Sequence, residues 1–137
     1  VVEIDNGSVV KVIAGSFGGV RGPMDDIVIH PEFFDCTVPA GQDFVHPTDP
    51  ACTAFIYVIG GAGQTDGQKL ENGKLVLFDE GEQLAVRAGK EALRFLLLTG
   101  KPLNEPVAWR GPIVMNTQEE LETAFREYRD GTFIQNQ

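Results

Sequence analysis

The sequence predicts an all-β domain of short strands, arranged as a sandwich or barrel and followed by one C-terminal α-helix. Windows rich in β-branched or aromatic residues recur at short spacing, and clusters of glycine and proline separate them. A capped, amphipathic helical pattern occurs only near the C-terminus. The 137 residues predict a single domain, 1–137, that can bury a core without disulfides or a metal.

The strand windows lie before residue 100 and are separated by turn residues. One window, 54–59, is apolar throughout, which predicts a strand buried on both faces. The glycine-rich stretch 60–63 follows it, and we interpret this stretch as a hairpin connection because no phosphate-binding G-x-G-x-x-G pattern follows. Asn72-Gly73 predicts another hairpin turn. The predicted strands are 9–14, 27–29, 33–38, 42–45, 54–59, 75–78, 83–88 and 93–98.

The C-terminal helix is specified by local signals at both ends. Thr117 and Glu120 have the spacing of a capping box, in which each side chain bonds the other residue's backbone N–H. Gly131 supplies the left-handed residue that ends a helix. Apolar residues at helical spacing predict one buried stripe, formed by Leu121, Ala124, Phe125 and Tyr128.

The segment 95–117 connects the last predicted strand to this helix. It holds three of the eight prolines and the only tryptophan, and its composition predicts an extended path across a protein surface. Such a segment either docks a partner or closes the core of its own domain. The candidate interface residues are Trp109, Arg110 and Met115.

Charge and composition exclude several classes of function. The net charge of −9 opposes direct binding of nucleic acid by the bulk surface. No apolar run reaches the ~20 residues of a membrane-spanning helix, so we expect no membrane partner. Cys36 and Cys52 are too few for a disulfide scaffold, which predicts free thiols in the cytoplasm, although one bridge between them stays open. The start at Val1 predicts a processed chain or a fragment.

Motifs for nucleophilic or metal catalysis are weak. The two serines, Ser8 and Ser16, stand outside any G-x-S-x-G pattern. His30 and His46 lack the H-x-H or H-E-x-x-H spacing of metal ligands. His46 is the better candidate because it ends a predicted strand, but a hydrogen-bonded or solvated loop histidine is the simpler interpretation.

Paired acids occur as Asp25-Asp26 and Asp79-Glu80. Both pairs lie in predicted turns, where adjacent carboxylates are usually solvated, so we predict no acid–base role for them.

The run 100–117, G-K-P-L-N-E-P-V-A-W-R-G-P-I-V-M-N-T, resembles the C-terminal region of the pirin family. The earlier stretches 33–35, 39–41 and 55–58 are similar to landmarks of the same family. Pirins are two-barrel proteins of the cupin superfamily. The resemblance therefore implies that this chain is one jelly-roll-like cupin barrel, the second of the two, with a C-terminal helix.

The resemblance also implies that the metal site is lost here. The iron ligands that support dioxygenase activity on quercetin-like flavonols belong to the first pirin barrel. In the general cupin pattern, counting back from Gly61 places Ala54 at the glutamate ligand, and counting from Gly89 places Ala92 at a histidine ligand. We therefore expect no metal, no cofactor and no catalytic residue in this chain.

Three functions follow from the resemblance. The first is a non-catalytic module that associates with a second copy of itself or with a metal-bearing pirin barrel. The second is part of a pirin-type iron-dependent quercetin dioxygenase, or a divergent cupin that uses His46. The third is a barrel that holds a small apolar ligand in an interior freed of metal. The candidate cavity residues are His46, Tyr57 and Ala92.

Overall fold

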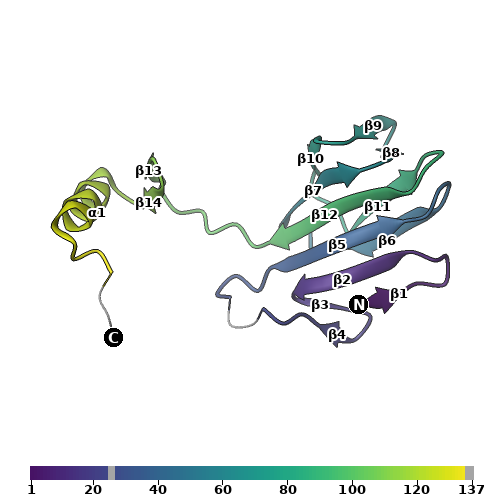
Figure 1. Ribbon diagram of the computed structural model, residues 1–137, viewed down its shortest axis with the longest axis horizontal. Coiled ribbons are helices and arrows are strands. Elements are labelled where there is room, and N and C mark those ends of the chain that lie inside the picture. Colours follow the sequence, from purple (N-terminus) through teal and green to yellow (C-terminus); the bar gives the residue numbers. More distant parts are fainter. Residues whose placement is uncertain (25–26, 135–137) are drawn as a thin grey trace. The chain divides into compact units, whose positions relative to one another are not determined.

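The computed structural model describes residues 1–24 and 27–134 (Figure 1). They form two compact units, the sandwich unit Val1–Pro102 and the C-terminal unit Leu103–Gln137, which are described separately below. The acid pair Asp25-Asp26 lies outside the described residues.

The larger sheet of the sandwich unit has six antiparallel strands. β5 and β12 pair over seven consecutive positions, from Leu93 opposite Val38 to Thr99 opposite Glu32, and β7 continues the sheet on the other side of β12. The strand order is β1 (Val2–Glu3), β2 (Val9–Ala14), β5 (Glu32–Val38), β12 (Leu93–Gly100), β7 (Thr53–Gly60) and β10 (Leu75–Leu77).

A four-stranded sheet forms the second layer, and one short hairpin extends from β2. The strand order in the second sheet is β6 (Asp43–Pro47), β11 (Gln83–Ala88), β8 (Ala62–Thr65) and β9 (Gln68–Glu71). The hairpin consists of β3 (Ser16–Phe17) and β4 (Val20–Arg21).

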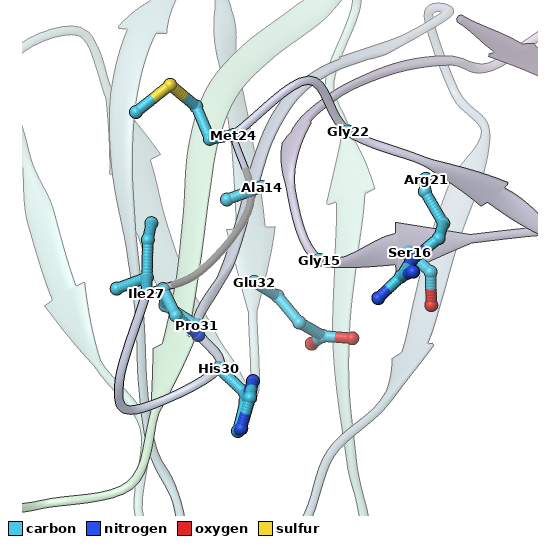
Figure 2. A pocket seen from close by; sticks show the side chains of 10 residues that line it. All are labelled: Ala14, Gly15, Ser16, Arg21, Gly22, Met24, Ile27, His30, Pro31 and Glu32. Carbon is cyan, nitrogen blue, oxygen red and sulfur yellow. The ribbon is translucent and has the colours of Figure 1, made fainter.

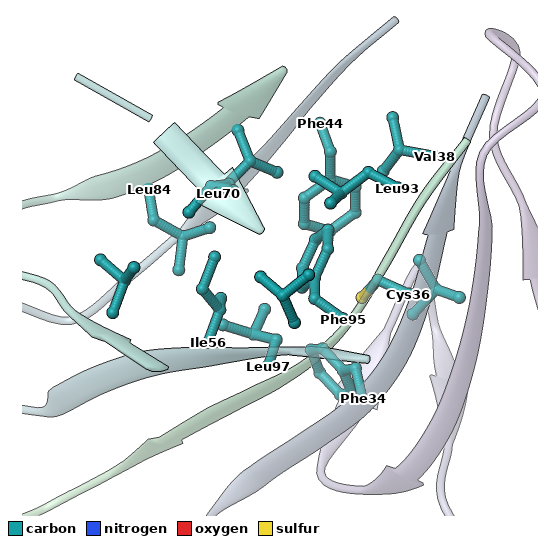
Figure 3. Close-up of a cluster of buried hydrophobic side chains, with 14 of the residues drawn as sticks. Phe34, Cys36, Val38, Phe44, Ile56, Leu70, Leu84, Leu93, Phe95 and Leu97 are labelled. Atoms are coloured by element: carbon teal, nitrogen blue, oxygen red, sulfur yellow. The ribbon is translucent and has the colours of Figure 1, made fainter. Parts of the chain in front are cut away.

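The two sheets enclose one apolar core. Strands β11 and β12 alternate buried and more exposed residues, so that one face of each points inward. Phe44 from the four-stranded sheet contacts Phe95 from the six-stranded sheet edge to face, with ring centroids 5.6 Å apart. Figure 3 shows how side chains such as Phe34, Ile56 and Leu97 fill the space between the layers. This packing confirms the predicted all-β architecture.

The C-terminal unit consists of a hairpin and the helix. The hairpin pairs β13 (Ala108–Arg110) with β14 (Ile113–Met115), and α1 spans Gln118–Asp130. The predicted capping box and the left-handed Gly131 are both present. A small core contains Ala108, Ile113, Leu121 and Ala124. Within the described residues, no helix is long and apolar enough to span a membrane.

The structure corrects two expectations for the strands. Residues 27–29 form a turn rather than a strand, because the backbone N–H of His30 donates to the carbonyl of Ile27. The window 54–59 is buried on one face only, since Ile56 is fully buried whereas Tyr57 is 39% exposed. β7 therefore has an outer face in contact with solvent.

Two predicted turns also differ from expectation. The stretch 60–63 is not a loop, since only Gly61 separates β7 from β8. Asn72-Gly73 forms a turn, but the strands on either side of it belong to different sheets. The segment 95–117 is not one extended path, because it contains the end of β12 and the whole β13–β14 hairpin.

Candidate functional site

His46 is one of the buried polar residues of the sandwich unit. It lies within strand β6 and is 4% exposed, so of the predicted hydrogen-bonded or solvated loop histidine only the hydrogen bond is present, to Glu32. Phe17 stacks on the imidazole at a centroid distance of 5.6 Å, and Phe34 meets it edge to face at 5.4 Å. The aromatic rings fix the plane of the imidazole.

The imidazole is held to a carboxylate at the start of β5. Nε2 of His46 donates to Oε2 of Glu32 at 2.9 Å, and the hydroxyl of Thr99 donates to the same oxygen at 2.9 Å. Nδ1 of His46 is buried and has no hydrogen-bond partner among the described residues. The three residues link β6, β5 and β12, so the network connects both sheets.

Glu32 also lines a pocket at this end of the sandwich unit. The pocket encloses about 250 Å³. Figure 2 shows the carboxylate of Glu32 directed into the space between His30 and the side chains of Ser16 and Arg21. The full lining is Ala14, Gly15, Ser16, Arg21, Gly22, Met24, Ile27, His30, Pro31 and Glu32.

The structure does not bring the three candidate cavity residues together. Tyr57 lies on the outer face of the six-stranded sheet, and Ala92 is exposed in the turn between β11 and β12. Of the three, only His46 faces the interior. Sequence reasoning missed Glu32 and Thr99, and the one local signal for them was the presence of polar residues at the ends of apolar strands.

The outer face of the six-stranded sheet also carries an ion pair. Arg94 donates two hydrogen bonds to Asp35, at 2.9 Å and 2.6 Å. These hydrogen bonds hold the pKa of Asp35 below its usual value. On the inner face of β5, the strand that carries Asp35, burial raises the pKa of the Cys36 thiol to about 12. Cys36 and Cys52 are free thiols.

The residues present do not fit a cupin iron centre. Such a centre needs converging His or carboxylate ligands, and no group of three or more His, Cys, Asp or Glu side chains that could hold a metal occurs within 1–24 and 27–134. Ala54, at the position that the pattern gives to the glutamate, is buried among apolar side chains.

The candidate interface residues lie in the C-terminal unit and differ in exposure. Trp109 is 73% exposed, and its indole N–H donates to the carbonyl of Gly111 at 2.7 Å. The guanidinium of Arg110 lies 4.2 Å from the ring centroid of Phe125, a cation–π contact. Met115 is half-buried against the small core. Of the three candidate interface residues, Trp109 is therefore the one whose apolar side chain remains exposed to solvent.

A second exposed apolar side chain lies opposite this tryptophan in the hairpin. Val114, its cross-strand partner in the hairpin, is 57% exposed. A groove of about 610 Å³ lies between the hairpin, the helix and the following segment. The groove is lined by Pro112, Ile113, Val114, Met115, Phe125, Tyr128 and Phe133. We call Trp109, Val114 and this groove the apolar face of the C-terminal unit.

Two antiparallel sheets around one apolar core, with a single C-terminal helix, define a cupin-type β-barrel protein. The crystal structure of quercetin 2,3-dioxygenase from Acinetobacter baumannii matches 97% of this chain with a TM-score of 0.87 and 31% identity. A family model described as the Pirin C-terminal cupin domain matches residues 33–134. The chain belongs to the pirin family, as its sequence predicted.

Named relatives agree with this assignment. Pirin-1 of Arabidopsis thaliana is 36% identical over 133 residues, covering 92% of this chain and 46% of its own length. A pirin-like protein of Caulobacter vibrioides is 35% identical over 130 residues, covering 94% of this chain and 47% of its own. The Acinetobacter match likewise covers 46% of that protein. The chain thus spans about half the length of the curated relatives it matches.

Proposed function

We propose that this domain acts by association, and that its apolar face docks against the other half of a pirin-type protein. The observation that carries the proposal is the exposure of Trp109 on a folded hairpin. Soluble proteins rarely leave a contiguous apolar patch uncovered, and such patches mark interaction sites. Tryptophan is also among the residues that contribute most to binding energy at protein interfaces.

The small core of the C-terminal unit supports this proposal. Four buried residues, none larger than leucine or isoleucine, stabilise the unit from within. Large apolar side chains such as Trp109, Val114 and Tyr128 are instead more than half exposed. Covering them with a partner would remove apolar surface from water at about 25 cal/mol per Å². The unit therefore gains stability by docking.

Two observations favour the other pirin half over a second copy. The relatives contain about as much chain again as the part that matches here, and that part is the natural occupant of a docking surface on this domain. A second copy would also carry the same net charge of −9, and like charge opposes self-association. The homodimer is thus the alternative outcome of the test.

A role in pirin-type dioxygenase activity would run through the same association. The Acinetobacter match is a quercetin 2,3-dioxygenase, but the described residues of this chain contain no group of His, Cys, Asp or Glu side chains that could hold an iron. Any activity on quercetin-like flavonols would then be contributed by the partner half. The centre of the sandwich is filled by side chains such as Phe44, Phe95 and Leu97, which disfavours an apolar ligand there.

Mass, metal content and turnover, measured together, test the proposal. We expect the purified chain to be monomeric across the micromolar range, to contain no stoichiometric iron and to leave quercetin unchanged. We expect a stable complex when the chain is mixed with the separately expressed half of the Acinetobacter protein that it does not match, after that half is shown to be folded. A homodimer would replace the proposed partner, and stoichiometric iron with quercetin turnover in the isolated chain would overturn the non-catalytic role. The predicted cytoplasmic location stays a prediction.

A further inference from the structure

The pocket beside Glu32 is separate from the apolar face and is lined by charged and polar groups together with apolar side chains such as Met24 and Ile27. It lies wholly within the sandwich unit, at the end of the sheets where β5 begins and the β3–β4 hairpin folds over (Figure 2). Its volume of about 250 Å³ is just below the ~300–1,000 Å³ of typical ligand sites, so it suits a small metabolite. Among the described residues that line it, the formally charged side chains are Arg21 and Glu32.

The carboxylate of Glu32 is fixed in position from behind. Two donors, Nε2 of His46 and the hydroxyl of Thr99, bond its Oε2. The imidazole of His46 is itself held by aromatic rings, and its only hydrogen bond in the described part of the chain is the one to Glu32. The buried histidine thus orients a carboxylate that the pocket can use, and preorganised groups of this kind bind ligands with little reordering cost.

Positive charge stands on the opposite wall. Arg21 ends the β3–β4 hairpin, and Figure 2 shows its guanidinium beside Ser16, facing the Glu32 side of the pocket. No ion pair joins Arg21 to Glu32. Arg21 and Glu32 therefore do not neutralise each other, and one ligand that carries the complementary charges can contact both, with Oε2 of Glu32 already held by His46 and Thr99.

The backbone of this wall is also constrained. A side chain at Gly22 would overlap the carbonyl of Ile13, so only glycine lets the two segments approach so closely. His30, on the other wall, has a left-handed backbone with φ of 45°, which is uncommon outside glycine. Backbone strain of this kind clusters at binding sites. Both walls are held in place by the fold.

We propose that this pocket binds a small zwitterion of the amino-acid type, with its carboxylate on Arg21 and its ammonium on Glu32. Charge selects this class over a simple anion or cation. The protein carries a net charge of −9, which repels free anions, whereas the described residues that line the pocket include one positive and one negative side chain, Arg21 and Glu32. A ligand with no net charge and two opposite ends satisfies both walls, and charge-assisted hydrogen bonds at each end supply the affinity.

Thermal unfolding of the full chain with the common protein amino acids, each supplied free at millimolar concentration, is the first test. A ligand that binds the folded chain raises its melting temperature. We expect at least one amino acid to do so, while its amide, which lacks the carboxylate, and its N-acetyl derivative, which lacks the ammonium, have a much smaller effect. If no amino acid stabilises the chain, or if either derivative binds as well as the parent, the proposal is overturned.

Substitutions then assign the two ends. Arg21→Gln should weaken binding about tenfold or more, and the amino acid and its amide should then bind alike. Glu32→Gln should likewise make the amino acid and its N-acetyl derivative bind alike. Arg87→Gln is the matched control. It breaks an exposed ion pair between Arg87 and Asp43 within the four-stranded sheet, and it should bind the amino acid as the wild type does. Unchanged affinity in Arg21→Gln, whose side chain is exposed, would contradict the proposed site even if Glu32→Gln fails to fold.

The test is independent of the association proposal. A Trp109→Ala variant should bind the amino acid as the wild type does, because every residue of the pocket belongs to the sandwich unit. Loss of ligand binding in that variant would count against a pocket formed by the sandwich unit alone.

Discussion

Replacing Trp109 by alanine should leave the chain folded and remove most of its affinity for the partner half. The indole is 73% exposed, so folding covers only about a quarter of a side chain that buries roughly 150–250 Å² when fully enclosed. That is on the order of 50 Å², or about 1 kcal/mol at 25 cal/mol per Å². The exposed hydrogen bond to Gly111 adds about 1 kcal/mol. Both losses together are small beside the ~5–15 kcal/mol that stabilises a typical domain.

The same side chain has far more to lose in a complex. Covering the remaining three quarters would remove on the order of 150 Å² from water, or about 3–4 kcal/mol. Residues at interface centres commonly cost about 2 kcal/mol or more when truncated. Since each 1.4 kcal/mol is tenfold in affinity, we expect the dissociation constant to rise at least about 30-fold.

Calorimetric titration of the partner half into each variant measures this difference. Leu77→Ala is the matched control, because Leu77 is an apolar residue 64% exposed on β10 of the sandwich unit. The control should bind as the wild type does. If Trp109→Ala binds within about threefold of the wild type, a difference below 1 kcal/mol, then the tryptophan only covers its own small core and the proposed docking surface is wrong.

Three further predictions concern stability and reactivity. The pair with Arg94 lowers the pKa of Asp35, so it stabilises the fold at pH values above the ordinary 3.8, and this contribution is lost as the pH falls below that value. In urea unfolding at several pH values, the free energy of unfolding should therefore fall less steeply with acid in Asp35→Asn than in the wild type. Equal acid dependence in the two proteins would refute the assignment. With a pKa of about 12, the buried Cys36 thiol should resist iodoacetamide in the folded chain and react in urea, whereas rapid labelling of the native protein would contradict its burial. Gly61→Ala should lower the melting temperature far more than Gly67→Ala, because both glycines have a left-handed backbone but only Gly61 lies against a backbone carbonyl. Equal decreases in melting temperature would show that the backbone around Gly61 can relax.

Local signals predicted the C-terminal helix with accuracy. The capping box joins Thr117 to Glu120, and Gly131 directly follows Asp130, the last residue of the helix. Each of these interactions joins residues at most four positions apart, so a short window of the sequence contains both partners. Of the predicted apolar stripe, Leu121 and Ala124 are buried, whereas Tyr128 is exposed and belongs to the open groove.

Pairing between distant segments could not be predicted in the same way. β8 and β9 contain glycine, glutamine and lysine, and they are strands because they pair with each other and β8 with β11. Residues 27–29 looked like a strand but have no partner strand. Register and sheet membership depend on the whole fold, which short windows do not contain.

The polar network at the end of the sandwich illustrates the same limit. Glu32 is 14 residues from His46 and 67 from Thr99, yet one carboxylate oxygen bonds both. The antiparallel register of β5 and β12 places Glu32 directly opposite Thr99. Sequence reasoning identified His46 as the better of two histidines but had no means to find its partners.

Backbone hydrogen–deuterium exchange of the chain, alone and with the partner half, measures directly whether the apolar face becomes covered in a complex. We expect slower exchange on mixing at residues 107–115, around Trp109, because docking covers the hairpin of the C-terminal unit. Exchange at the open end of the sandwich, near Glu32, should be unchanged. No added protection in the hairpin under conditions where a complex forms would contradict the claim that the apolar face is the surface through which this domain associates.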